Sequence, residues 1–195
     1  MNPLNATKES SEKGNEPSEE RRPFDWYGKA RSRLWSKHPQ GLETVPPAAL
    51  LIGTFFYAGL SPVASGTVGS LAAAAIYYFL PGLQNPIVLA MACVVMLVAG
   101  IWSGGVIERT LNVQDPGIVV IDEVLGQWIA LFSIHYAGNL TYVLIAFLFF
   151  RIFDVIKAPP ARYFDRKEGG VGIMLDDVVA GVYALLAAHI VMLLF

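Results

Sequence analysis

The sequence has few charged residues and almost no cysteine. Only 15% of its 195 residues are charged, against about 25% in an average soluble domain. The single cysteine, Cys93, lies inside an apolar run, so an internal disulfide and a site with several cysteine metal ligands are both excluded. Residues 1–22 contain no apolar stretch of the kind that marks a signal peptide. What remains to be explained is a chain dominated by apolar residues.

The charges that are present are concentrated at the N-terminus. Residues 1–45 hold 15 of the 30 charged residues, and residues 46–195 hold the other 15 in 150 positions. We expect residues 1–20 to be disordered, because they are rich in Ser, Glu, Asn and Lys. Residues 21–38 interleave Lys and Arg with aromatic residues, which is typical of a segment lying on a membrane surface. A nucleic-acid-binding arm is the weaker interpretation. The chain therefore divides into a polar tail and a membrane-embedded domain.

Apolar runs in the second part predict an all-α, polytopic membrane bundle of about five transmembrane helices. The runs are 14 to 23 residues long, against the roughly 20 that span a bilayer, and the first run is short. A further apolar stretch, residues 46–60, is interrupted by Gly53 and Gly59 and is predicted to be re-entrant or interfacial. The five runs lie near residues 67–80, 86–104, 118–136, 140–156 and 173–195.

The distribution of Lys and Arg predicts a cytoplasmic N-terminus, because basic residues are retained on that side. Five spans then place the uncharged loops 81–85 and 137–139 outside. They place loops 105–117 and 157–172 inside, the first with Glu108 and the second with four basic residues. With this topology, the unusual charges of the apolar domain all collect on the cytoplasmic side. Charged groups at membrane depth are costly and mark functional sites.

Two pairs of adjacent acids lie at the starts of apolar runs, Asp122 with Glu123 and Asp176 with Asp177. Mg²⁺ prefers oxygen ligands, so these acids predict a magnesium site. Because adjacent helical residues point about 100° apart, we expect one of Asp122 and Glu123 to reach the metal and the other to bind a neighbouring group or the substrate. The glycine-rich residues 169–172 predict a loop before a helix that opens with the second pair. Simple capping of helix N-termini is the weaker alternative.

Arg151, Asp154 and Lys157 are spaced at three-residue intervals at the end of an apolar run, so they share a broad helix face. One arginine can donate two parallel hydrogen bonds to a phosphate, whereas a lysine acts on it as a point charge. The three residues therefore predict a phosphate site. An intrahelical ion pair whose long side chains extend to the membrane surface is the weaker alternative.

Residues 61–70 are rich in Ser and Gly and open an apolar run. Ser65, Gly66 and Thr67 lie where the first backbone N–H groups of a helix could bind a phosphate. The spacing does not match a P-loop, and a cap with a tight turn explains this segment equally well. His38, His135 and His189 are scattered, and none is spaced to pair with a carboxylate.

In these segments the chain resembles the phosphatidylglycerophosphatase A family, over roughly residues 48–188. The resemblance implies a Mg²⁺-dependent enzyme of the bacterial inner membrane, which removes the terminal phosphate of phosphatidylglycerophosphate. Ser65 and Ala158 stand where the family usually has proline; neither is a charged position, so the implied chemistry is unaffected. The matching motifs are Ser61 to Ser70, Ile-Asp-Glu-Val-x-Gly at 121–126, Phe-Arg-Ile-Phe-Asp-x-x-Lys at 150–157 and Gly-x-Gly-Ile-Met-Leu-Asp-Asp at 170–177.

Motifs and resemblance together predict the roles of ten residues. Either an aspartate or a water activated by the ion could attack phosphorus; we favour the water because no Asp-x-Asp-x-Thr motif is present. The predicted catalytic acids are Asp122, Glu123, Asp154, Asp176 and Asp177, of which all but Asp154 are metal ligands, and the predicted phosphate-binding residues are Arg151, Lys157, Ser65, Gly66 and Thr67.

Three other functions compete with a lipid phosphatase. An ion-coupled transporter could also use intramembrane carboxylates, but it would need charges near the midplane and usually an inverted repeat. A CDP-alcohol phosphotransferase would need an Asp-Gly-x-x-Ala-Arg core, which is absent. A membrane subunit with a purely structural role would need no acid cluster.

Overall fold

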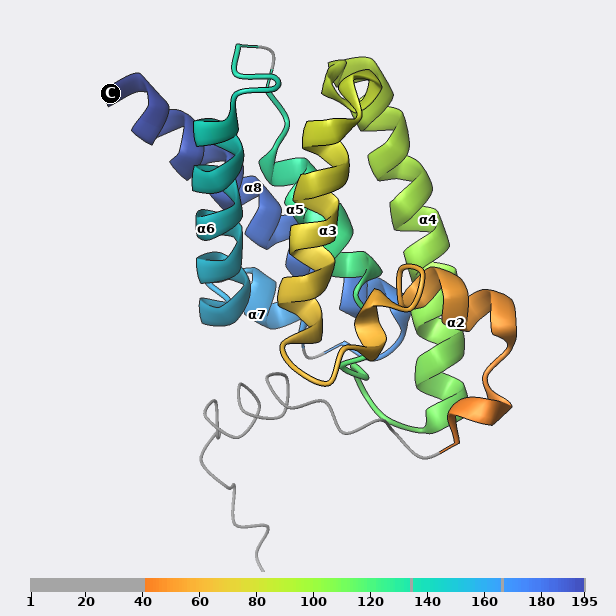
Figure 1. The fold of residues 1–195 in the computed structure, drawn as a ribbon. Coiled ribbons are helices and arrows are strands. Elements are labelled where there is room, and N and C mark those ends of the chain that lie inside the picture. Colours follow the sequence, from red (N-terminus) through yellow and green to blue (C-terminus); the bar gives the residue numbers. More distant parts are fainter. Residues whose placement is uncertain (1–40, 134, 166, 195) are drawn as a thin grey trace, which may run out of the picture.

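The computed structural model describes residues 41–133, 135–165 and 167–194, and there the chain consists of helices joined by turns and non-helical connections (Figure 1). The all-α prediction is confirmed for these residues. The predictions for the N-terminal tail concern residues that lie almost entirely outside the described ranges. In chain order the elements are η1 Leu42–Thr44, α2 Pro47–Gly53, η2 Ala58–Leu60, α3 Ser65–Phe79, η3 Pro81–Gln84, α4 Pro86–Leu111, α5 Ile121–Ala130, α6 Leu140–Ile156, α7 Ala161–Phe164 and α8 Gly170–Leu194.

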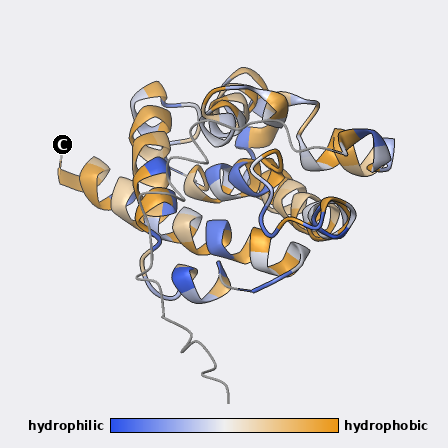
Figure 2. Ribbon diagram, turned by 90° about the horizontal axis from the view of Figure 1, so that it is seen from below, coloured by the Kyte–Doolittle hydropathy of each residue, from blue (hydrophilic) through white to orange (hydrophobic). Residues whose placement is uncertain are grey.

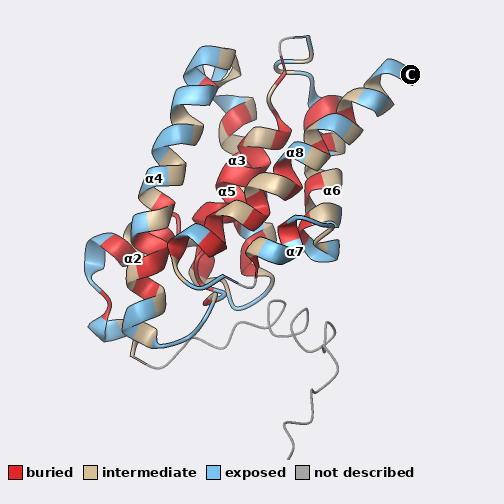
Figure 3. Ribbon diagram, turned by 180° about the vertical axis from the view of Figure 1, so that it is seen from behind, coloured by how far each residue is buried: buried red, intermediate tan, exposed pale blue. Residues whose placement is uncertain are grey.

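Helix α5 is the centre of the bundle, with α3, α4, α6 and α8 packed around it (Figures 1 and 3). Nine of its ten residues are buried. Trp128 Nε1 donates a hydrogen bond to the carbonyl oxygen of Ala73 on α3, at 3.1 Å. On the side of α8, a Cβ added at Gly181 would lie 2.5 Å from the carbonyl oxygen of Gly126. Glycine at both positions therefore allows the two backbones to approach closely, which fixes α5 among its neighbours.

The outer helices expose apolar side chains, the reverse of a soluble domain. On α6 the exposed residues Leu144, Leu148, Ile152 and Val155 follow helical spacing and form one stripe. Figure 2 shows that hydrophobic residues predominate along most of the helices. Within the described ranges, α4 and α8 are long and apolar enough to cross a membrane, judged by length and composition. An apolar exterior on such helices is what lipid contact requires.

The apolar run at 118–136 does not form one spanning helix. Helix α5 covers only Ile121–Ala130, about 15 Å at 1.5 Å per residue, which is half the thickness of a bilayer core. Residues 118–120 are non-helical, and the chain leaves the helix again at Leu131. The prediction of five transmembrane helices is thus not confirmed. A short helix buried inside a bundle and a spanning helix have the same apolar composition, so the sequence did not distinguish them.

Two helices extend further toward the site than expected. Because α4 runs to Leu111, Glu108 lies in a helix and not in a loop. Because α8 begins at Gly170, Asp176 and Asp177 lie in its second turn and do not open it. A Cβ added at Gly170 would lie 1.9 Å from the carbonyl oxygen of Ile101 on α4. Because Gly170 has no side chain, the first turn of α8 can pack directly against α4. The sequence had predicted a loop here.

The stretch 46–60 is interrupted after Gly53, whereas Gly59 lies within a 3₁₀ turn, and its re-entrant or interfacial character stays a prediction. Helix α2 ends at Gly53, and a 3₁₀ turn follows at Ala58–Leu60. Gly53 accepts a hydrogen bond through its carbonyl oxygen from the N–H of Val120, at 2.9 Å. A Cβ added at Gly59 would lie 2.0 Å from the carbonyl oxygen of Ile118. The stretch therefore packs against the segment that leads into α5 and fixes where that helix begins.

Candidate active site

Four helix ends converge on one side of the bundle. They are the N-terminus of α3, the first turn of α5, the last turns of α6 and the second turn of α8, toward the lower half of Figure 1. The predicted catalytic acids and Arg151 lie on these segments and Lys157 directly follows α6, whereas Glu108 lies on α4. These residues therefore lie toward one end of the bundle.

Three carboxylates form the centre of the site. Asp122 and Glu123 of α5 and Asp177 of α8 each offer an oxygen, and these oxygens lie within 4.8 Å of one another. All three residues are buried, with Asp177 only 2% exposed. Like charges this close repel strongly in a buried setting. Such a group requires protons or a cation to balance its charge.

The group fits a magnesium ion. Its donors are carboxylate oxygens, the ligand type that Mg²⁺ prefers. Asp122 Oδ1 is buried and has no hydrogen-bond partner among the described residues, which is costly unless another ligand satisfies the oxygen. The structure differs from the expectation that only one of Asp122 and Glu123 reaches the metal, since an oxygen of each belongs to the same group. The longer glutamate side chain can swing toward its neighbour despite the 100° offset.

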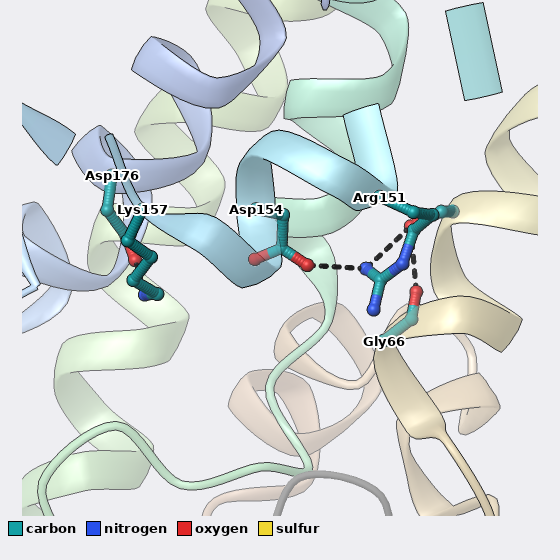
Figure 4. Close-up of polar contacts among 6 residues, drawn as sticks. Gly66, Arg151, Asp154, Lys157 and Asp176 are labelled. Carbon is teal, nitrogen blue, oxygen red and sulfur yellow. Dashed lines mark hydrogen bonds and ion pairs between the residues drawn. The ribbon is translucent and has the colours of Figure 1, made fainter. Parts of the chain in front are cut away.

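Arg151 lies beside this carboxylate group and is held in place by two contacts. Its Nη1 forms an ion pair with Asp154 Oδ2 at 2.7 Å and donates to the hydroxyl of Ser70 at 3.3 Å. The Ser70 hydroxyl in turn donates to the carbonyl oxygen of Gly66 at 2.8 Å. Figure 4 shows the guanidinium between Asp154 and Gly66. The arginine side chain remains 20% exposed, so a positioned cation is still accessible to a ligand.

Gly66 is where α3 meets both the carboxylates and the arginine. A Cβ added there would lie 2.3 Å from Glu123 Oε1 and 3.4 Å from Arg151 Nη1. Only glycine leaves room for both groups. The site therefore has an anionic side and a cationic side, which meet at the first turn of α3.

The rest of the first turn of α3 matches the predicted phosphate cradle in part. The residue before the helix, Ala64, has φ 49° and no side chain that could cap the helix. The first N–H groups of a helix have no partner within it, and they carry its positive dipole end. The Ser65 hydroxyl is engaged elsewhere, since it donates to the carbonyl oxygen of Gly117 at 2.7 Å. Thr67 is half-buried. The backbone of this turn is thus better placed than its hydroxyls to meet an anion.

Lys157 and Asp176 lie outside the group of three carboxylates. Lys157 Nζ forms ion pairs with Asp165 Oδ1, at 2.8 Å, and with Asp176 Oδ2. Figure 4 shows Lys157 beside Asp176, away from Arg151. Sequence reasoning placed Lys157 on the phosphate and Asp176 on the metal, and it missed Asp165. No periodicity links Asp165 to either partner, because it follows the separate short helix α7.

Glu108 and His189 make contacts outside the group of three carboxylates. Glu108, near the end of α4, accepts a hydrogen bond through Oε1 from the N–H of Gly169 at 2.8 Å, which ties α4 to the start of α8. His189 lies late in α8, where Nδ1 is 3.3 Å from the Tyr142 hydroxyl and 2.9 Å from the carbonyl oxygen of Leu185. The ring of this histidine also packs edge-on against Tyr142.

Comparison with known proteins gives one family match and relatives whose names include two different lipid substrates. A family model described as Phosphatidylglycerophosphatase A matches residues 51–192. The chain is 39% identical over 158 residues to a phosphatidylglycerophosphatase A of Escherichia coli, covering 78% of this chain and 83% of that protein. It is 36% identical over 137 residues to a phosphatidylglycerophosphatase A of Haemophilus influenzae, covering 70% and 83%. A Bacteroides thetaiotaomicron protein, provisionally named phosphatidylinositol-3-phosphatase, is 41% identical over 142 residues, covering 70% and 89%. No solved structure matches.

Proposed function

This chain belongs to the phosphatidylglycerophosphatase A family, and from that premise we propose that it hydrolyses the terminal phosphomonoester of phosphatidylglycerophosphate in a Mg²⁺-dependent reaction. The products would be phosphatidylglycerol and phosphate, in phospholipid biosynthesis. Family membership supports lipid phosphatase activity. The observation that carries the finer proposal is the group of three buried carboxylates beside Arg151 and the first turn of α3.

In this proposal Asp122, Glu123 and Asp177 hold the magnesium ion. Their oxygens are close enough to share one ion. Asp122 Oδ1 is buried without a hydrogen-bond partner among the described residues, and a bound ion would give it one. When bound, Mg²⁺ would supply positive charge to the phosphomonoester and to the water that attacks it. The protein's part is to keep the three carboxylates together, through the buried position of α5 and its glycine contact with α8.

Arg151 and the first turn of α3 would bind the phosphate oxygens. A guanidinium can offer two parallel N–H donors to a phosphate, and Asp154 orients it from the same helix. The backbone N–H groups of Gly66 and Thr67 would add donors at the helix N-terminus. We leave Lys157 out of this set, because two carboxylates already hold it.

Hydrolysis of the phosphomonoester forms one bond from a water oxygen to phosphorus and breaks the bond from phosphorus to the lipid oxygen. The departing oxygen takes a proton and leaves as an alcohol. Most of the rate enhancement in phosphoryl transfer comes from positioning and charge stabilisation. The residues named above could supply both, because the three carboxylates and the guanidinium held by Asp154 lie on either side of Gly66.

We further propose a multi-pass protein of the bacterial inner membrane, with this site on the cytoplasmic side. The apolar exteriors of α4 and α8 support membrane insertion, and the loop charges support the orientation. A site at the ends of the helices suits a lipid whose phosphate lies at headgroup depth. No observation favours the ion-coupled transporter, because the acids lie at one end of the bundle and not midway along its helices.

The relatives' names include two different headgroups, glycerol and inositol. Both would present a phosphomonoester on a polyol that is linked to a lipid. Protein purified in detergent should be assayed for phosphate release from phosphatidylglycerophosphate, phosphatidylinositol-3-phosphate and phosphatidic acid, with the variant Asp122→Asn as the inactive control. We expect kcat/KM to be at least about tenfold higher for phosphatidylglycerophosphate. A preference for the inositol lipid would contradict the substrate, and release from none would contradict the function.

A further inference from the structure

Lys157 joins three segments of the chain at the edge of the site. It directly follows α6, with φ 49°, and its ammonium group contacts Asp165, just after α7, and Asp176, in the second turn of α8. The side chains are 15%, 5% and 6% exposed, in that order. We call these three residues the Lys157 ion-pair cluster. Buried charges persist only when they are paired, so the three depend on one another.

The cluster explains how two adjacent aspartates can have different environments. Asp176 and Asp177 point about 100° apart on α8. Asp177 joins the group with Asp122 and Glu123, whereas Asp176 turns to Lys157. Without the lysine, a fourth negative charge would lie next to three others. Lys157 therefore neutralises the acid that is nearest to the group along the chain.

We propose that Asp165 is a positioning residue of this site: it fixes Lys157 against Asp176, and the summed charge of the ion-pair cluster sets how tightly the three neighbouring carboxylates bind a divalent cation. The proposal rests on the cation-binding part of the proposed function. It also assigns to Lys157 a role in balancing charge, in place of a contact with the phosphate.

Charge balance predicts opposite effects for two substitutions in one ion pair. Asp165→Asn removes a negative charge, so a cation should bind more weakly. Lys157→Met removes a positive charge, so a cation should bind more tightly. The double variant removes one charge of each sign and should bind nearly as the unchanged protein does. General damage to the fold would instead weaken binding in all three variants.

The test is the dissociation constant for Mg²⁺, measured by calorimetric titration of the full-length protein in detergent. We expect it to rise about fourfold or more for Asp165→Asn and to fall about fourfold or more for Lys157→Met, as expected for one unit charge acting on a divalent ion across roughly 10 Å of high-dielectric medium. Glu168→Gln is the matched control, because Glu168 is an exposed acid three residues further along the same connection, and it should leave the constant unchanged. Shifts of the same sign in both single variants, or no shift in either, would overturn the proposal.

A second measurement separates this proposal from the proposed function. The melting temperatures of the two single variants and the double variant are compared in EDTA. If Asp165 and Lys157 are partners, the double variant loses less than the two single losses added together; additive losses would overturn the pairing. If the unchanged protein binds no Mg²⁺, the proposed metal site is wrong. The melting temperatures in EDTA still show whether Asp165 and Lys157 are partners. Should Asp165→Asn not fold, Asp165→Ser, which also removes the negative charge, replaces it in both measurements.

Discussion

Replacing Gly66 by alanine should disable the site without unfolding the protein. The added Cβ would lie 2.3 Å from Oε1 of Glu123 and 3.4 Å from Nη1 of Arg151. Carbon and oxygen atoms pack comfortably at roughly 3.4 Å, so the glutamate carboxylate would have to move by about 1 Å. A displacement of this size at a reacting centre can lower the rate about 100-fold. We therefore expect kcat/KM for phosphatidylglycerophosphate to fall by about that factor.

The fold should tolerate this change for two reasons. Alanine is a better helix former than glycine by up to about 1 kcal/mol, and the atom it meets is the far end of a flexible side chain. Gly117→Ala is the matched control, because a Cβ there has no heavy atom within 4 Å although Gly117 contacts the hydroxyl of Ser65. Phosphate release and melting temperature are measured for both variants. Full kcat/KM in Gly66→Ala, or a loss of melting temperature that matches its loss of activity, would refute the reasoning.

Three further substitutions test other parts of the account. Asp177→Asn should abolish phosphate release. It should also raise the free energy of unfolding in EDTA by ~1 to 3 kcal/mol, because it removes one of three like charges within 4.8 Å. A lower melting temperature in EDTA would contradict this. Arg151→Lys should lower kcat about 100-fold, the usual effect of losing a donor to the transition state, with the melting temperature kept; unchanged kcat would remove the arginine from the phosphate site. Gly126→Ala should lower the free energy of unfolding by about 1 to 3 kcal/mol through overpacking, since its Cβ would lie 2.4 Å from the Phe150 ring. Gly82→Ala is the control and should leave stability unchanged, because the space around Gly82 is open. Thermal melts of both variants test this difference.

Helix boundaries were predictable where the chain contains strong local signals. The predicted start of α4 at residue 86 and both ends of α6 match the structure. Asn85 and Asn139 cap these two helices with their side chains, and the prolines at 159 and 160 prevent α6 from continuing. Such signals act within a few residues, so they can be read from the sequence.

The length of α5 was not predictable in the same way. Apolar residues continue from Ile118 to Tyr136 with only Asp122, Glu123 and a few small or polar residues between them. The helix ends at Ala130, although no proline or glycine follows before Gly138, so no strong local signal marks this end. Hydropathy alone does not separate a buried helix from a lipid-facing one.

The candidate site shows the same division. Asp122, Glu123, Asp177 and Arg151 could be predicted because charges in apolar runs are conspicuous and costly. The partners of Lys157 could not be, because Asp165 lies in a polar connection where an acid is unremarkable. Its contact with Lys157 at 2.8 Å depends on how α6, α7 and α8 fold against one another.

The central claim is that three buried carboxylates form a magnesium site that hydrolyses a lipid phosphomonoester. The most direct test measures phosphate released from phosphatidylglycerophosphate by the unchanged protein, first with Mg²⁺ and then with excess EDTA. The account predicts steady release with Mg²⁺, almost none with EDTA, and recovery when Mg²⁺ is restored. Equal release in EDTA would contradict the metal site, and no release under either condition would contradict the catalytic claim itself.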